Sequence, residues 1–173
     1  VYPFLIRDAE SRRPMGVISV NEETDAVDGV MISEDFRTPP PHEYDELPSD
    51  WKPVRAAFRS LHDGFKSEYD RAVVPGAVMH CLYFTSVRPS AQKQGVMKTL
   101  WDETLAVASD YGFRKVIAEA STEEVRHVLE EKLGFRKMSQ VPYSTWKFEG
   151  FPVLKEAHEH KPEEWKNLWL GIR

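Results

Sequence analysis

The sequence contains little cysteine, with Cys81 as the single thiol among 173 residues. One cysteine can form neither an intrachain disulfide framework nor a metal site with several cysteine ligands, so both of these scaffold classes are excluded. No apolar run is long enough to cross a bilayer, and the first residues given do not have the pattern of a signal peptide. We therefore expect a cytoplasmic protein with no bound metal and no membrane partner.

The sequence also has fewer basic than acidic residues, with 23 Lys and Arg, 28 Asp and Glu and a formal net charge of −5. Proteins that bind nucleic acid usually have a basic face, so this balance argues against a nucleic-acid partner. The charge is compatible with a cationic small-molecule substrate, and also with a surface that is merely soluble. The length and the hydrophobic fraction of 41% fit one soluble domain with a single core.

The first half of the sequence predicts a hairpin, a loop and a helix. Two runs rich in β-branched residues flank the turn-forming NEETD, which indicates an antiparallel hairpin over residues 15–33. Residues 34–50 are expected to be a loop, because three consecutive prolines block regular structure. Over residues 51–70 apolar residues recur three and four positions apart, which predicts an amphipathic helix. The apolar residues 1–9 are compatible with a helix or a strand.

The second half alternates strands and helices. The almost wholly apolar residues 77–87 predict a central strand that is covered on both faces. A long helix is expected over residues 96–112, where a glycine ends it. A short buried strand follows from Lys115, and Thr122 then begins a helix that runs through Glu131.

The C-terminal part completes the predicted sheet. Residues 133–138 and 144–150 are expected as the last two strands, and residues 163–170 as a short amphipathic helix. The whole order of elements is that of an α/β domain with a mixed sheet. The strand from Lys115 is expected to lie parallel to the strand over residues 77–87, through a right-handed crossover.

The segment with the clearest chemical pattern is SVRPSAQKQGVMKTLW, in which a buried strand runs into a short loop and directly on into a helix. The first N–H groups of a helix have no earlier carbonyl partner, and with the helix dipole they form a site for a pyrophosphate. The pattern alone leaves a second reading open, since many such loops bind nothing. The groups that could donate to a phosphate are the N–H groups of Gln94, Gly95, Val96 and Met97 and the side chains of Gln92, Lys93 and Lys98.

Two motifs, in this order, resemble those of the GNAT superfamily of acyl-CoA-dependent acetyltransferases. Residues 92–97, QKQGVM, resemble the acyl-CoA loop of that family, Q/R-x-x-G-x-G/A, and Val87 and Pro89 match its V-x-P lead-in. Residues 129–135, LEEKLGF, resemble the family's helix that ends in E-K-L-G-F. Met97 departs from the pattern, because the family has a small residue there, and it can crowd or shift the phosphate.

The resemblance covers residues 17–150 and implies a GNAT-type fold, a mixed, mostly antiparallel sheet flanked by helices, with a central parallel strand pair splayed for acyl-CoA. Residues 1–173 are then expected to be a single acetyltransferase domain. Family members have a strand and a helix before the hairpin, and the chain starts at Val1 rather than Met, so we expect these two elements to be missing. The resemblance implies that acetyl-CoA is the acyl donor and places residues 116–120 beside it. The implied cofactor-binding residues are Phe84, Thr85, Val87, Gln92, Lys93, Gln94, Gly95, Val96, Met97 and Lys98.

Within the superfamily the chain is similar to the arylalkylamine and dopamine N-acetyltransferases and their bacterial relatives. The similarity rests on residues 29–36, GVMISEDF, and on a tail with Tyr143, Trp146, Phe148, Pro152 and the tripeptide AHE at 157–159. It implies acetyl transfer to a small primary amine, with an arylalkylamine as one candidate. The residues that could line an aromatic pocket, or pack as ordinary core, are Phe36, Phe58, Phe65, Tyr143 and Trp146.

Four residues are candidates for catalysis in such a reaction. His158 occupies the family's tail position and titrates near neutrality, which favours it as the base, although an exposed tail histidine fits equally well. Glu34 could bind an ammonium or relay a proton, or be a solvated loop acid. Tyr83 lies on the strand face that would meet the cofactor. Glu130 stands where many relatives have the tyrosine that protonates the thiolate, which leaves Tyr143 as a distant substitute.

Two further functions stay open on the sequence alone. The absent tyrosine and Met97 are compatible with a non-catalytic acyl-CoA-binding or interaction domain of the same fold. Acylation of a protein N-terminus or lysine is the other reading, because the acidic loop 34–50 suits a small amine or a basic peptide. Homodimers are common in the family, and the sequence does not decide the oligomeric state.

Overall fold

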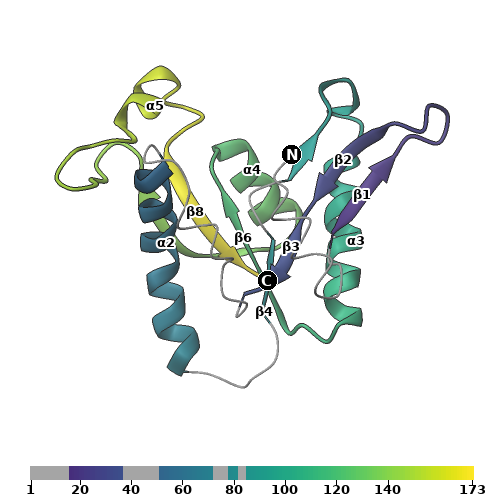
Figure 1. Ribbon diagram of the computed structural model, residues 1–173, viewed down its shortest axis with the longest axis horizontal. Helices are drawn as coiled ribbons and strands as arrows, with labels where there is room; N and C mark the ends of the chain where they lie inside the picture. The colour runs from purple at the N-terminus through teal and green to yellow at the C-terminus, as the bar shows by residue number, and fades with distance from the viewer. Residues whose placement is uncertain (1–15, 37–50, 72–77, 82–84) are drawn as a thin grey trace. The chain divides into compact units, whose positions relative to one another are not determined.

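The computed structural model describes residues 16–36, 51–71, 78–81 and 85–173, which Figure 1 draws as ribbons. The chain forms two compact units, Val1–Tyr44 with Gly76–Val116 and Asp45–Pro75 with Ile117–Arg173. Each unit is therefore assembled from two separate stretches of the chain. Among the described residues, no helix is long and apolar enough to cross a membrane.

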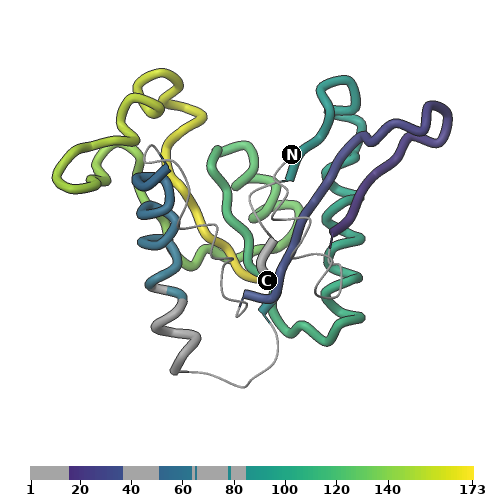
Figure 2. The backbone as a smooth tube through the Cα atoms, in the orientation of Figure 1, coloured from purple at the N-terminus to yellow at the C-terminus, as the bar shows by residue number. Residues whose placement is uncertain are grey.

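The first described element of this unit is the predicted hairpin, visible as the purple tube in Figure 2. β1 (Val17–Val20) and β2 (Val27–Met31) pair antiparallel. The side-chain oxygen of Asn21 accepts hydrogen bonds from the N–H groups of Glu23 and Thr24, both at 3.0 Å, and Asp25 adopts a positive φ of 58°. An asparagine that bonds to the backbone in this way is what turns the chain between the two strands, so the predicted hairpin is confirmed.

The strand predicted over residues 77–87 is divided into two strands that have different partners. β4 (Val78–Cys81) pairs with β3 (Ser33–Asp35), whereas β5 (Ser86–Val87) pairs with β2 in a three-stranded sheet of order β1-β2-β5. Ser33 lies opposite Cys81 in the pair of β3 and β4, and Val30 lies opposite Ser86 in the pair of β2 and β5. The parallel pairing expected with the strand from Lys115 stays a prediction.

α3 (Val96–Asp110) packs against β1 and β2 within the first unit. Gly29 allows this close approach, because a Cβ atom there would lie 2.9 Å from Leu100 Cδ1 and 3.0 Å from Val96 Cγ1. Thr104 is fully buried, and its hydroxyl donates to the Met31 sulfur at 3.0 Å. The helix ends as predicted, with Gly112 at a φ of 77°.

The second unit contains an antiparallel sheet of order β6-β8-β7, formed by β6 (Lys115–Ala120, whose first two residues belong to the first unit), β7 (Arg136–Pro142) and β8 (Asn167–Ile172). α2 (Lys52–Arg71), the helix predicted over residues 51–70, packs against β7 and β8. The side chain of Ser139 on β7 donates to the Leu61 carbonyl on α2 at 2.5 Å. Helix α2 therefore covers one face of this sheet.

The helix expected over residues 163–170 is wrong, because β8 begins at Asn167, occupies the second half of that segment and lies between β6 and β7. Leu168, Trp169 and Leu170 are all buried, so the segment is covered on both faces, and short apolar runs of this kind do not separate strand from helix by periodicity. The strand expected over residues 144–150 is also absent. Residues 143–145 form a turn, and a single bridge joins Phe148 to Phe151.

The helix predicted from Thr122 is present in two parts, α4 (Glu123–His127) and the π-helical turn η4 (Val128–Lys132). The Thr122 hydroxyl accepts a hydrogen bond from the N–H of Val125 at 3.4 Å, which confirms the predicted N-cap. Gly134 ends the turn at a φ of 72°. A further short helix, α5 (Lys155–His160), lies in the segment between β7 and β8.

Candidate functional site

The loop that follows β5 is held by polar contacts to β2 and by hydrogen bonds within the loop. Arg88 donates to the Asp28 carboxylate at 2.5 Å, and its N–H donates to the Asp28 carbonyl at 2.8 Å. The side-chain amide of Gln92 donates to the Val87 carbonyl at 3.3 Å, and that of Gln94 donates to Ser90 at 2.9 Å. The turn η3 (Pro89–Ala91) lies between these contacts. The two glutamines predicted as phosphate donors therefore brace the loop through their side chains.

Gly95 is the N-cap of α3 and lies in the left-handed region, with a φ of 85° and no side chain to cap the helix. The first intrahelical bond runs from the Thr99 N–H to the Gly95 carbonyl at 3.1 Å. By helix geometry, the N–H groups of Val96, Met97 and Lys98 then have no carbonyl one turn earlier. Lys93 also has a positive φ, 64°, which is uncommon for a residue with a side chain. The result is an exposed helix start that suits an anion.

The two lysine side chains around this helix start, Lys93 and Lys98, are exposed. Lys98 pairs with Asp102 at 2.5 Å, but both side chains are more than half exposed, so the pair is weak and the ammonium can turn toward another anion. Met97 is half-buried, as are Thr85 and Val87. Two other predicted residues, Tyr83 and Phe84, lie outside the described residues.

His158 is half-buried on α5, with its Nδ1 atom 2.9 Å from the Trp165 carbonyl. A carbonyl oxygen only accepts, so Nδ1 carries the hydrogen and donates it. This tautomer leaves the lone pair on Nε2, which is the form a general base needs.

Tyr143 is buried, and its hydroxyl donates to the Ser121 carbonyl at 3.1 Å. Burial raises the pKa of Tyr143 to about 12, so the hydroxyl keeps its proton at neutral pH. Its ring lies 5.9 Å from that of Trp165, between centroids. Tyr143 and His158 therefore both contact Trp165, Tyr143 through the indole ring and His158 through the backbone carbonyl. Glu34, on β3, is half-buried and belongs to the other unit.

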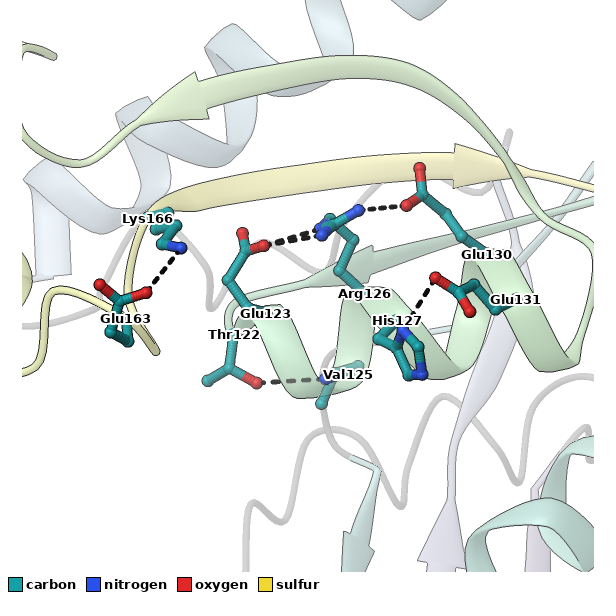
Figure 3. A network of polar contacts seen from close by, with 9 residues as sticks. All are labelled: Thr122, Glu123, Val125, Arg126, His127, Glu130, Glu131, Glu163 and Lys166. Atoms are coloured by element: carbon teal, nitrogen blue, oxygen red, sulfur yellow. Dashed lines mark hydrogen bonds and ion pairs between the residues drawn. The ribbon is translucent and has the colours of Figure 1, made fainter.

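An ionic network holds α4 and the π-helical turn, and Figure 3 shows it. Arg126 donates to Glu123 at 2.8 Å and pairs with Glu130 one turn later. His127 and Glu131 form an exposed pair at 3.0 Å, and Lys166 pairs with Glu163 at 2.9 Å. Glu130 is thus paired with the Arg126 guanidinium within this network.

Sequence reasoning missed a second histidine–carboxylate pair, in the second unit. His62 on α2 lies with its Nε2 atom 2.5 Å from the Glu119 Oε1 atom on β6, and the two side chains are 13% and 1% exposed. The one signal available was a glutamate inside the apolar run KVIAEA, since charged residues are rarely buried without a partner. The sequence did not indicate which residue would pair with it.

Comparisons with known proteins match the fold rather than the sequence. No family model and no curated protein matches the chain. The C-terminal condensation domain of Ebony in complex with β-alanyl-dopamine is similar in structure, with a TM-score of 0.76 and 14% identity over 98% of this chain and 78% of that one. Arylalkylamine N-acetyltransferase 2 from Aedes aegypti has a TM-score of 0.72 and 14% identity, over 100% and 80% of the two chains.

A bacterial structure with its cofactor is also similar. The yncA protein from Salmonella typhimurium, a putative acetyltransferase solved with acetyl-CoA, has a TM-score of 0.55 and 18% identity, over 99% of this chain and 72% of that one. The described strands and helices match these structures across nearly the whole chain, which confirms the predicted fold class. The chain has the GNAT acetyltransferase fold.

Proposed function

We propose that the protein is an N-acyltransferase that moves the acetyl group of acetyl-CoA to a primary amine by direct attack. The observation that carries the proposal is the uncapped, glycine-started helix after β5, in a chain with the fold of N-acetyltransferases. Its free N–H groups and helix dipole fit the pyrophosphate of the cofactor. The earlier sequence motif and the observed geometry thus indicate the same ligand.

The cofactor in this proposal extends from the start of α3 toward β5. The backbone at Gly95, Val96, Met97 and Lys98 binds the pyrophosphate, while Gln92, Lys93 and Gln94 shape the loop around it. Backbone groups near Tyr83, Phe84, Thr85 and Val87 pair with the pantetheine and polarise the acyl carbonyl. Polarising the carbonyl stabilises the oxyanion that forms when the amine attacks.

The attacking amine must first lose a proton, and we assign this step to His158. The Trp165 carbonyl holds its ring so that Nε2 can accept the proton. Glu34 is proposed to attract the ammonium group, and Tyr143 is proposed to position the segment that carries Trp165 rather than to transfer a proton, given its raised pKa.

Replacing His158 with alanine is expected to lower kcat by about 100-fold, because general bases contribute that much or more. The dissociation constant for acetyl-CoA should not change, since in this proposal His158 acts on the amine and not on the cofactor. Steady-state kinetics and calorimetry measure the two quantities. His160→Ala is the matched control, because His160 is exposed on the same helix. Wild-type rates for His158→Ala at every pH would remove His158 from the mechanism.

The acceptor we propose is a small amine, with an arylalkylamine first among candidates. Two of the similar structures carry such an amine, or a derivative of one, in their names. The net charge of −5 favours cationic over anionic acceptors in general terms. Acylation of a peptide N-terminus and binding without turnover are the competing outcomes of the test below.

Release of free CoA thiol from acetyl-CoA across a panel of amines tests the function. We expect release with tryptamine-like or phenethylamine-like compounds, at rates at least about tenfold above those with amino acids. Polyamines and basic peptides complete the panel. Release with basic peptides alone would shift the assignment to protein acetylation. No release, with acetyl-CoA binding confirmed by calorimetry, would leave a binding domain.

A further inference from the structure

Asp28 is a buried carboxylate that the reaction described so far does not use. It lies on β2 and is 9% exposed, whereas every other acidic residue described in the first unit is half-buried or exposed. A carboxylate removed from water in this way costs free energy unless a partner compensates it. The partner is Arg88, whose guanidinium donates to Asp28 Oδ1 at 2.5 Å. The pair therefore joins β2 to the first residue of the loop that follows β5.

Arg88 is fixed at three points where this loop begins. Its N–H donates to the Asp28 carbonyl at 2.8 Å, which extends the pairing of β5 with β2 by one residue. Its guanidinium bonds to the Asp28 side chain, and its carbonyl accepts from the Ala91 N–H at 2.9 Å, across the turn η3. Pro89 follows, with a φ that its ring restricts. The direction in which the loop leaves the sheet is therefore set at Arg88.

The other end of the loop is seated on the next residue of β2, Gly29. A Cβ atom at Gly29 would lie 3.0 Å from Val96 Cγ1 and 2.9 Å from Leu100 Cδ1, so the start of α3 contacts the strand at this residue. Consecutive residues of a strand face opposite sides of the sheet. Asp28 and Gly29 thus anchor the two ends of residues 88–96, one from each side of β2.

We propose that Asp28 is a positioning residue for the binding of acetyl-CoA, which acts through Arg88 on the loop that ends at Gly95. This role rests on the proposed function, in which the N–H groups at the start of α3 bind the pyrophosphate. A loop that is fixed before its ligand arrives loses less conformational entropy on binding, so the ligand binds more tightly. Asp28 itself does not touch the cofactor in this assignment.

The charge of Asp28 by itself predicts the opposite effect on affinity. The phosphates of acetyl-CoA are negative, as is the Asp28 carboxylate, so its removal would strengthen binding if Coulomb interactions alone mattered. The released guanidinium of Arg88 would add to this gain. A loss of affinity on removing Asp28 therefore reports on the position of the loop and not on charge.

Calorimetric titration with acetyl-CoA measures the effect. We expect Asp28→Ala to raise the dissociation constant about tenfold, which corresponds to ordering about one backbone residue on binding. Arg88→Ala should give a similar loss, and the double variant should stay within about twofold of either, because both changes break one link. Asp28→Asn keeps an oxygen that accepts from Arg88, so its loss should be smaller, about threefold. In steady-state kinetics the KM for acetyl-CoA should rise, while kcat stays within about twofold.

Two control variants separate positioning from charge and from stability. Asp110→Asn removes an exposed carboxylate at the far end of α3 and should leave the affinity for acetyl-CoA unchanged. Thr104→Val removes the buried hydroxyl that bonds to Met31 in the same unit. It should lower the temperature of thermal unfolding and leave the affinity unchanged as well.

Unchanged or tighter binding of acetyl-CoA by Asp28→Ala would overturn the proposal, and Asp28→Asn decides the question in the same way if Asp28→Ala does not fold. A loss confined to Arg88→Ala would overturn it too, because that result marks a direct contact of the guanidinium with a phosphate. The absence of acetyl-CoA binding by the wild-type protein is the different result that would reject the proposed function itself.

Discussion

Replacing Gly95 with glutamate is expected to weaken acetyl-CoA binding by at least about 100-fold. A carboxylate there would enter the position of the proposed pyrophosphate at the start of α3. Two like unit charges 4 Å apart repel by about 4 kcal/mol at the effective dielectric constant of a protein surface. This energy corresponds to a loss of affinity of about a thousandfold, and screening by salt reduces the loss. Calorimetric titration with acetyl-CoA measures the effect. Wild-type affinity would refute the placement of the cofactor.

The same substitution also strains the backbone, and a matched variant separates the two effects. Gly95 has a φ of 85° and Gly112 a φ of 77°, both are exposed, and a Cβ atom at either meets nothing within 4 Å. The two residues lie at opposite ends of α3. Any side chain in this region costs about 1 kcal/mol. Gly112→Glu should therefore lose similar stability to thermal unfolding and keep full affinity for acetyl-CoA.

Gly171→Ala is expected to lower the free energy of unfolding by about 3 kcal/mol or more, which is the upper end of the usual cost of substitutions that overpack a core. A Cβ atom at Gly171 would lie 2.0 Å from Cη2 and 2.4 Å from Cζ3 of Trp169, a ring that is fully buried. The neighbouring strands β6 and β7 both pair with β8, so the backbone has little freedom to move away. Urea unfolding followed by tryptophan fluorescence measures the loss.

A double-mutant cycle assigns that loss to its cause. Phenylalanine lacks the outer ring atoms of Trp169 that a new Cβ would strike. In the Trp169→Phe background, Gly171→Ala should cost less by at least about 1 kcal/mol. Gly16→Ala serves as a control, since its Cβ would meet only the Met31 carbonyl at an ordinary 3.7 Å. Additive losses would show that the clash with the ring is not the reason.

The elements that sequence analysis predicted correctly are those with local signals. The turn at Asn21, the N-cap at Thr122 and the glycine that ends α3 each act through bonds between residues close in the chain. The segment of β8 was predicted as a helix because the strand conformation depends on pairing with β6 and β7. A short window of sequence around β8 contains neither of these partners.

In the candidate site, too, only the features formed by residues close together in the sequence could be predicted. The loop around Gly95 could be predicted because a strand, a glycine and a helix start are consecutive in the sequence. The pair of His62 and Glu119 could not, since the two residues are 57 positions apart and meet only when α2 packs on its sheet. The orientation of His158 likewise depends on where the Trp165 carbonyl lies, which no residue pattern encodes.

The order of β6, β8 and β7 in their sheet has a consequence for the growing chain on the ribosome. β8 is synthesised after the other two, yet it is the strand that both of them bond to. Until Asn167–Ile172 has emerged, β6 and β7 each present an unpaired edge, and such edges associate with other chains. The vulnerable interval lasts for the synthesis of the segment that carries α5, so slow translation there is expected to favour aggregation over folding.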